Sequence, residues 1–245
     1  MSNEQTFSLI SGEADELFGR LDSVPPPLPK PVSGASKVET FALYARREEP
    51  CRTVVAALDT VRLQQNLEDY LRHRWPNKTP WQVGRDFERY VGFRYEERGY
   101  KVTYNGITEH EEDYGVDLFC VSEARVLAVQ CKNWKDPVMW REVAMIAGAS
   151  LAAARSAGWL SAIPVLLTTG PLPTETIQYA NRANVVVRRV VPREYPVIKC
   201  KRSSNYFHLP WHSNYDRTKL ISDQGDRRVF RVEEAVLDGF VPAQG

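Results

Sequence analysis

The chain has 245 residues, of which 43% are hydrophobic and 26% charged, and its formal net charge is +1. This composition is typical of a globular protein and excludes a disordered chain, and the length allows one sizeable domain with smaller additions. No apolar run reaches the roughly 18 residues of a transmembrane helix, and the polar start MSNEQTFS has no signal-peptide character, so we expect a cytoplasmic protein.

The four cysteines are scattered and form no CxxC pair. Cys120 and Cys131 fall inside apolar runs, where a thiol usually behaves as a small hydrophobic side chain. This usage fits a reducing compartment. The near-neutral net charge argues neither for nor against nucleic-acid binding, which must therefore be judged from local charge.

Three segments precede the central part of the chain. Residues 1–22 form an N-terminal amphipathic segment, with Leu9, Leu17 and Phe18 among acidic residues. Residues 23–37 are a proline-rich linker, because prolines favour extended chain. Residues 38–78 contain apolar positions at helical spacing and predict a helical region. We expect these segments to serve partner contacts or dimerisation rather than chemistry.

Residues 79–192 predict one α/β domain. Its first helix begins with Thr79 as N-cap, Pro80 in the first turn and Gln82 completing a capping box, and Gly99 ends it. Strands follow at 101–104, 116–121 and 125–132, then a helix opening at 136–137, a strand at 161–169, a helix at 173–182 and a strand at 184–190. This order predicts a mixed sheet with helices on both faces. Residues 193–245 differ in composition and predict a separate small module.

Charged and amide side chains interrupt the apolar hairpin at 116–132. Side chains alternate along a strand, so Gln130 and Lys132 share one face and Cys131 takes the other. The hairpin can place Asp117 opposite or diagonal to them. A carboxylate, an amide oxygen and an ammonium suit a Mg²⁺ site for phosphodiester hydrolysis, because Mg²⁺ prefers oxygen ligands and a lysine stabilises phosphate charge.

The helix over residues 80–98 contributes a further carboxylate. Glu88 falls in the stripe of residues at three- and four-residue spacing that contains Trp81, Gly84, Val91 and Tyr95. A carboxylate in an apolar stripe needs compensation by a cation, for which Lys132 or a metal would serve. Singly, Asp117 could cap a turn and Lys132 could end a strand in solvent. The joint order of Glu88, Asp117 and Gln130-x-Lys132 favours one site.

The motifs GRDFERYV, DYGVDLFC and VLAVQCKNW, in this order, resemble the restriction-endonuclease-like PD-(D/E)xK nucleases, and specifically the Mrr-type branch, whose last motif is commonly QxK. The resemblance covers roughly residues 81–191. It implies an αβββαβ core with a mixed central sheet flanked by helices, extended here by an N-terminal helical part and a small C-terminal module. It also implies Mg²⁺- or Mn²⁺-dependent cleavage of DNA, in this branch often the restriction of foreign or modified DNA.

Carried over residue by residue, the resemblance makes Asp117 the metal-binding aspartate and Lys132 the catalytic lysine. Gln130 stands where Glu or Gln completes the metal site, and Glu88 matches the helix carboxylate. Asp113, just before the core aspartate, takes a supporting role. Because cutting both strands commonly needs two such sites, we expect a homodimer.

Basic residues cluster from 182 to 202. Such a run is often a solvated face, but beside a nuclease-like core it suits phosphate contacts. The predicted DNA-binding residues are Lys135, Arg188, Arg189, Arg193, Lys199, Lys201 and Arg202.

The tail has the spacing His208-x-Pro210-x-His212 followed by VFRVEEAVLDGFVP. It resembles the small zinc-binding module of Ada-type DNA repair proteins, which has cysteines at the two histidine positions and two more after the final proline. Two histidines with Cys200 are few for zinc. We therefore favour a metal-free remnant over a zinc site at Cys200, His208 and His212.

The main hypothesis is a Mg²⁺-dependent DNA endonuclease that acts in defence or on foreign or modified DNA. The first alternative is a non-catalytic module of the same fold that binds nucleic acid or a protein partner, because Gln130 leaves the site one formal charge short. The second is a junction-resolving or repair nuclease. DNA cleavage assays with different substrates separate the three.

Overall fold

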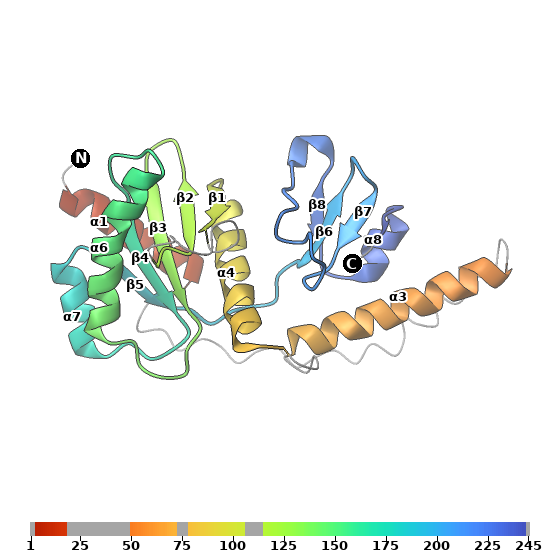
Figure 1. Ribbon diagram of the computed structural model, residues 1–245, viewed down its shortest axis with the longest axis horizontal. Helices are drawn as coiled ribbons and strands as arrows, with labels where there is room; N and C mark the ends of the chain where they lie inside the picture. Colours follow the sequence, from red (N-terminus) through yellow and green to blue (C-terminus); the bar gives the residue numbers. More distant parts are fainter. Residues whose placement is uncertain (1–2, 19–49, 73–77, 106–114, 244–245) are drawn as a thin grey trace. The chain divides into compact units, whose positions relative to one another are not determined.

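The computed structural model describes residues 3–18, 50–72, 78–105 and 115–243, which belong to two compact units (Figure 1). The first unit comprises residues 1–26 and 79–193, and the second comprises residues 27–78 and 194–245. Over these described ranges, no helix is both long enough and apolar enough to cross a membrane.

A mixed sheet of five strands forms the centre of the first unit (Figure 1). Its order is β1-β2-β3-β4-β5, in which β1, β2 and β3 are antiparallel and β3, β4 and β5 are parallel. The strands are Lys101–Tyr104, Leu118–Val121, Val126–Lys132, Ile163–Thr168 and Val186–Arg189. The predicted α/β class, with a mixed sheet flanked by helices, is confirmed.

Helix α4 (Pro80–Glu96) begins as its sequence predicts. The Thr79 side chain accepts the Gln82 N–H at 3.2 Å, and the Gln82 side chain accepts the Thr79 N–H at 2.8 Å. This reciprocal pair is a capping box, and Pro80 costs nothing in the first turn because its missing N–H has no helical partner there. Gly99 follows the helix at φ +80°, a conformation that favours glycine.

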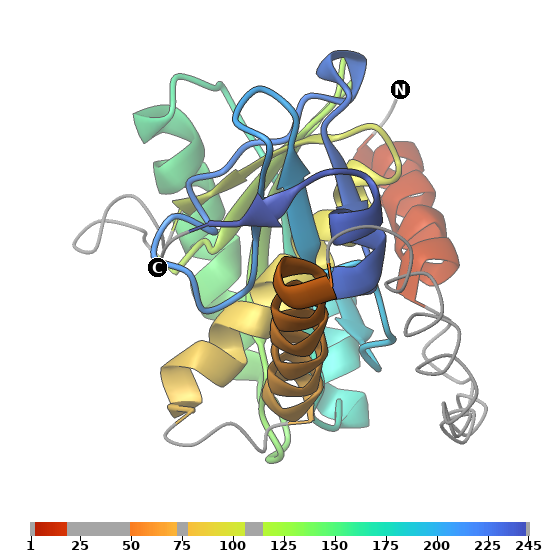
Figure 2. The same ribbon diagram turned by 90° about the vertical axis from the view of Figure 1, so that its right-hand side faces the viewer.

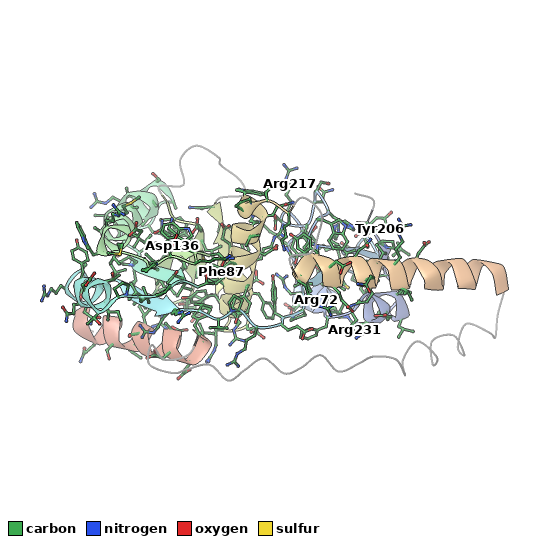
Figure 3. All side chains as sticks on the ribbon, turned by 90° about the horizontal axis from the view of Figure 1, so that it is seen from below. Arg72, Phe87, Asp136, Tyr206, Arg217 and Arg231 are labelled. Atoms are coloured by element: carbon green, nitrogen blue, oxygen red, sulfur yellow. The ribbon has the colours of Figure 1, made fainter. Side chains whose placement is uncertain are left out.

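Helices cover both faces of this sheet. On one face, α6 (Trp140–Ser156) and α7 (Thr174–Arg182) enclose an apolar core that includes Ala128, Ile146 and Leu166. Helix α4 packs on β1, β2 and β3, and its Phe87, 2% exposed, points toward the sheet (Figure 3). Helix α1 (Asn3–Phe18) packs beside β5, and its Phe18 ring lies 5.7 Å from that of Tyr95 on α4.

The helix predicted to open at 136–137 begins instead at Trp140. Val138 is fully buried, and its N–H donates to the Pro171 carbonyl at 3.0 Å, which keeps this segment extended against the chain after β4. The Met139 N–H donates to the Glu142 side chain at 3.0 Å, so the first helical turn is capped three residues later than expected.

Ion pairs attach α1 to the sheet. Arg188 of β5, 5% exposed, donates from Nε to Asp15 at 2.6 Å and from Nη2 to the Ser11 carbonyl at 2.8 Å. Arg125, in the turn just before β3, donates to Glu13 at 2.7 Å. The acidic residues of the amphipathic segment therefore pair with basic residues of β5 and of the β2–β3 turn.

The second unit contains a four-stranded sheet in the order β8-β6-β7-β9. The strands, in chain order from β6, are Ile198–Lys201, Tyr206–His208, Arg227–Val229 and Val241–Pro242, and a short 3₁₀ helix spans Ser222–Gln224. Helix α8 (Val232–Leu237) lies next to α3 (Pro50–Leu71) in Figures 1 and 2. Leu67 of α3 packs in the core of this sheet, and Gln64 accepts the Val232 N–H at 3.0 Å.

We expect Arg188→Ala to lower the free energy of unfolding by about 2–3 kcal/mol, because it removes several charge-assisted hydrogen bonds at a buried position. Urea denaturation followed by circular dichroism measures the loss. Arg182→Ala, which changes an exposed arginine on α7, is the matched control and should stay within about 0.5 kcal/mol of the parent. Equal stability of the two variants would contradict the attachment of α1 through Arg188.

Candidate active site

The strands β2 and β3 stop pairing at the point where the predicted site residues lie. Their last paired residues are Leu118 and Val129, so Asp117 and Gln130 would form the next pair. Instead, the Asp117 carboxylate accepts the backbone N–H of Cys131 at 2.6 Å, while the Asp117 N–H donates to the Val129 carbonyl at 2.9 Å. The carboxylate thus takes the place of a backbone acceptor, and the regular pairing of the two strands ends here.

Gln130 is 3% exposed and has a fixed orientation. Its Nε2 donates to the Gly115 carbonyl at 2.9 Å. Because a carbonyl only accepts, the amide nitrogen must face it, and the amide oxygen points elsewhere. That oxygen, Oε1, is buried and has no hydrogen-bond partner among the described residues. A buried acceptor without a partner is costly, and a bound ion is one group that can satisfy it.

Gly115 makes this arrangement possible. Its φ is +74°, and a Cβ at this position would lie 3.1 Å from the Gln130 Nε2. A side chain here would be strained by the backbone conformation and would also press on the amide. Gly115 was not among the predicted site residues, although its place two residues before Asp117 in DYGVD was a usable signal.

Lys132 ends β3, and strand alternation places it on the same face as Gln130 and Ala128. Its Nζ lies 4.9 Å from the centre of the Trp134 ring, within the range of a cation–π contact. Its carbonyl accepts the Thr169 N–H at 3.0 Å, which ties the end of β3 to the end of β4.

Glu88 lies on α4 with 17% of its side chain exposed. Its Oε2 pairs with Arg85 at 2.9 Å, and Arg85 is 4% exposed. One cation that compensates Glu88 is therefore Arg85 of the same helix, beside the predicted partners, which were Lys132 or a metal. The apolar stripe predicted for this helix is wrong at one position, because Trp81 is 62% exposed.

The Cys131 thiol, between Gln130 and Lys132 on β3, has a perturbed pKa. Burial, and then the negative charges of Asp117 and Glu88, raise the pKa of the Cys131 thiol well above its ordinary value. The thiol stays protonated at neutral pH, which makes it a packing residue rather than a nucleophile.

A hydrogen-bond network that the sequence analysis missed joins the elements of this edge. Asn133 donates from Nδ2 to the Val83 carbonyl of α4 at 3.0 Å and accepts from the Thr169 hydroxyl at 2.9 Å. Arg189, at the end of β5, donates to the Thr169 carbonyl at 3.2 Å. Helix α4 and strands β3, β4 and β5 are therefore connected at the ends nearest Lys132.

The donor set suits a hard divalent cation. Asp117 offers a carboxylate and Gln130 a buried amide oxygen that has no partner in the described part of the chain, and both are oxygen ligands of the kind that Mg²⁺ and Mn²⁺ prefer. No cluster of three or more His, Cys, Asp or Glu residues with metal-binding spacing occurs in the described ranges. Asp113, predicted to support the site, lies outside the described residues.

Two of the predicted DNA-binding residues are corrected by their burial. Arg188 pairs with Asp15 beneath α1, and Lys199 is 6% exposed with its Nζ donating to the carbonyls of Tyr215 and Thr218. Neither is a surface phosphate contact. Lys201 is half-buried and pairs with Asp226. The predicted residues that are exposed are Lys135, Arg189, Arg193 and Arg202.

The residues predicted for a zinc site are not brought together. Cys200 pairs with Phe207 in the β6–β7 register and lies in the apolar core, where burial raises its pKa to about 11. His208 is one residue further along β7, so its side chain takes the opposite face. The rings of His208 and His212 are 6.4 Å apart, and burial lowers the pKa of both.

Comparison with known proteins identifies the first unit. A family model described as "Restriction endonuclease", of the Mrr type, matches residues 82–189, from the first turn of α4 to the last residue of β5. Neither the curated proteins nor the solved structures contain a match to the chain. The matched segment includes Glu88, Asp117, Gln130 and Lys132. The mixed sheet, its flanking helices and this match agree: residues 82–189 form a restriction-endonuclease-like domain of the Mrr type.

Proposed function

We propose that the protein is a Mg²⁺- or Mn²⁺-dependent DNA endonuclease that hydrolyses phosphodiester bonds, in defence or on foreign or modified DNA. The observation that carries the proposal is the buried Oε1 of Gln130, which has no hydrogen-bond partner among the described residues, at the end of the β2–β3 pairing where Asp117 also lies. The family match over residues 82–189 supports the same activity.

In this proposal, Asp117 and the Gln130 oxygen hold the metal, and Glu88 supplies a further carboxylate from α4. The bound divalent ion would lower the pKa of a bound water and neutralise charge on the phosphate. Lys132 positions the attacking water and stabilises the negative charge that develops on the phosphate oxygens. Lys135, Arg189 and Arg193 of the first unit contact phosphates, and Arg202 is proposed as a phosphate contact of the second unit by itself.

Arg85 gives the alternative its specific support. An arginine already neutralises Glu88, and an amide stands where a carboxylate would add charge, so the domain could bind DNA without cutting it. Salt-sensitive DNA binding with no cleavage under Mg²⁺ or Mn²⁺ would favour that reading. Preference for branched or nicked DNA over methylated and plain plasmid would instead favour a junction-resolving or repair nuclease.

We also propose that the protein acts as a homodimer, because one such site cuts one strand. Light scattering of the full chain, alone and with duplex DNA, measures the oligomeric state. If the protein stays monomeric with DNA and nicks supercoiled plasmid without linearising it, the homodimer proposal is wrong.

We expect Asp117→Asn and Lys132→Ala each to reduce cleavage of plasmid DNA by at least 100-fold, since each removes a group that acts on the reacting phosphate. Rates of conversion of supercoiled DNA in Mg²⁺ and in Mn²⁺ measure the effect.

The controls come from the far end of the same strands. Glu123→Gln changes an exposed acid in the β2–β3 turn, and Lys101→Ala changes an exposed lysine at the start of β1. Both should cleave within about twofold of the parent, since they lie outside the site and surface changes have small effects. Cleavage by Asp117→Asn at the control rate would end the catalytic proposal.

We expect Gln130→Leu to lose the stabilisation that a divalent metal gives to the parent, because leucine offers no oxygen. Gln130→Glu should show a larger stabilisation by metal than the parent. Without metal it is less stable, because a carboxylate faces the Gly115 carbonyl in place of a donor, and with metal its added negative charge binds the ion more tightly. The measurement is the melting temperature with and without Mn²⁺, in the absence of DNA. The same metal-induced shift in the parent and in Gln130→Leu would remove Gln130 from the ligand set.

A further inference from the structure

Two exposed tryptophans lie beside the candidate site. Trp134 is 40% exposed in the loop after β3, and Trp81 is 62% exposed in the first turn of α4. Tryptophan exposes a large apolar surface at a cost, and exposed tryptophans commonly mark recognition surfaces. Neither residue is used by the proposed chemistry.

Each tryptophan is next to a charged residue of the site. The Lys132 Nζ lies 4.9 Å from the Trp134 ring centre, and the Arg85 guanidinium, which pairs with Glu88, lies 5.5 Å from the Trp81 ring centre. The hydrogen bond from Asn133 to the Val83 carbonyl joins the two segments that carry them. The rings therefore belong to the same corner of the domain as Lys132 and Glu88.

The loop that carries Trp134 is firmly held. The Thr169 hydroxyl lies within hydrogen-bond distance of the Asn133 side chain and of the Trp134 carbonyl, at 2.9 and 3.0 Å. A Cβ on Gly170 would lie 2.4 Å from the carbonyl oxygen of Asp136, so only glycine allows the loop to approach β4 so closely; Figure 3 labels Asp136 in this loop. The exposure of Trp134 is thus preorganised, which lowers the entropic cost of binding.

We propose that Trp134, together with Trp81, stacks on bases of the DNA strand beside the phosphate that is cut. This inference rests on the proposed function and adds its substrate class: DNA whose bases are accessible at the cleavage site, either single-stranded or locally unpaired. In an intact duplex the base faces are covered by their neighbours, whereas an unpaired base presents a face to an aromatic ring. Lys132 holds the phosphate while the adjacent ring takes the base.

The first measurement is binding without metal, so that affinity is separated from cleavage. Fluorescence anisotropy in EDTA compares a labelled single strand, the intact duplex and the same duplex with a central unpaired bubble. The parent should bind the single strand and the bubble more tightly than the duplex. Trp134→Ala should lose roughly tenfold on the first two, and less than about twofold on the duplex, as expected for the loss of one stacked base.

Matched variants show whether the effect is specific. Trp134→Phe keeps an aromatic face and should retain most of the affinity. Trp140→Ala removes another exposed tryptophan, 51% exposed and packed on Tyr179 of α7, and should bind like the parent. Trp81→Ala should lose affinity for unpaired DNA in the same direction as Trp134→Ala. Circular dichroism and melting temperature confirm that each variant is folded.

An abasic scan tests stacking directly. Removing one base at a time from the bubble should weaken parent binding roughly tenfold at one or two positions. These positions should lose their effect in Trp134→Ala but keep it in Lys132→Ala, because the lysine contacts the phosphate. An equal abasic profile in the parent and in Trp134→Ala would overturn the inference.

The two proposals fail in different ways. Absence of cleavage on every DNA with every metal sinks the proposed function, while the coupling between Trp134 and a base remains measurable in EDTA. Normal cleavage together with parent-like binding by Trp134→Ala on all three DNAs sinks the stacking inference alone.

Discussion

The hydrogen bond from the Cys131 N–H to the Asp117 carboxylate is the interaction on which the site depends. Up to Leu118 and Val129, β2 and β3 satisfy each other's backbone groups. Beyond that pair, the Asp117 side chain accepts the Cys131 N–H in place of a backbone acceptor, so the regular pairing ends without leaving this N–H unpaired. A carboxylate at this point ends the backbone hydrogen bonding between β2 and β3 and itself accepts a backbone N–H of the second segment. Asp117 therefore has a structural reason for its place as well as a proposed chemical one.

The acidic side chains at this edge each have a polar partner. The Asp117 carboxylate accepts a backbone N–H and Glu88 pairs with Arg85, while Gln130 is neutral. Burial of ionised groups is tolerated when each has such a partner. The apolar sheet can thus end in polar groups while retaining the packing of Ala128 and Leu166 beneath them. The one group left without a partner among the described residues of this edge, the Gln130 oxygen, is uncharged, so its cost is moderate.

Local sequence signals predicted the elements well because they depend on near neighbours. Thr79, Pro80 and Gln82 specify the start of α4 through contacts within four residues, and the short turn fixes the hairpin register that brings Asp117 opposite Gln130. Counting basic residues along the chain predicted wrong DNA contacts where distant segments of the chain meet. Arg188 and Lys199 belong to a basic run, but α1 covers the first, and the carbonyls of Tyr215 and Thr218 hold the second. Spacing alone likewise could not show that Cys200 faces the core while His208 faces away.

An amide in place of a second strand carboxylate changes how the proposed site would acquire its ion. With a neutral oxygen in place of one carboxylate, the proposed site binds a cation less tightly, because each missing charge lowers the attraction. A DNA phosphate entering beside Lys132 brings negative charge to the same point. Metal and DNA would then bind with positive coupling, and by reciprocity each would raise the affinity of the other. A rigid Trp134 that engages only accessible bases would restrict this coupling to DNA opened at the cleavage site.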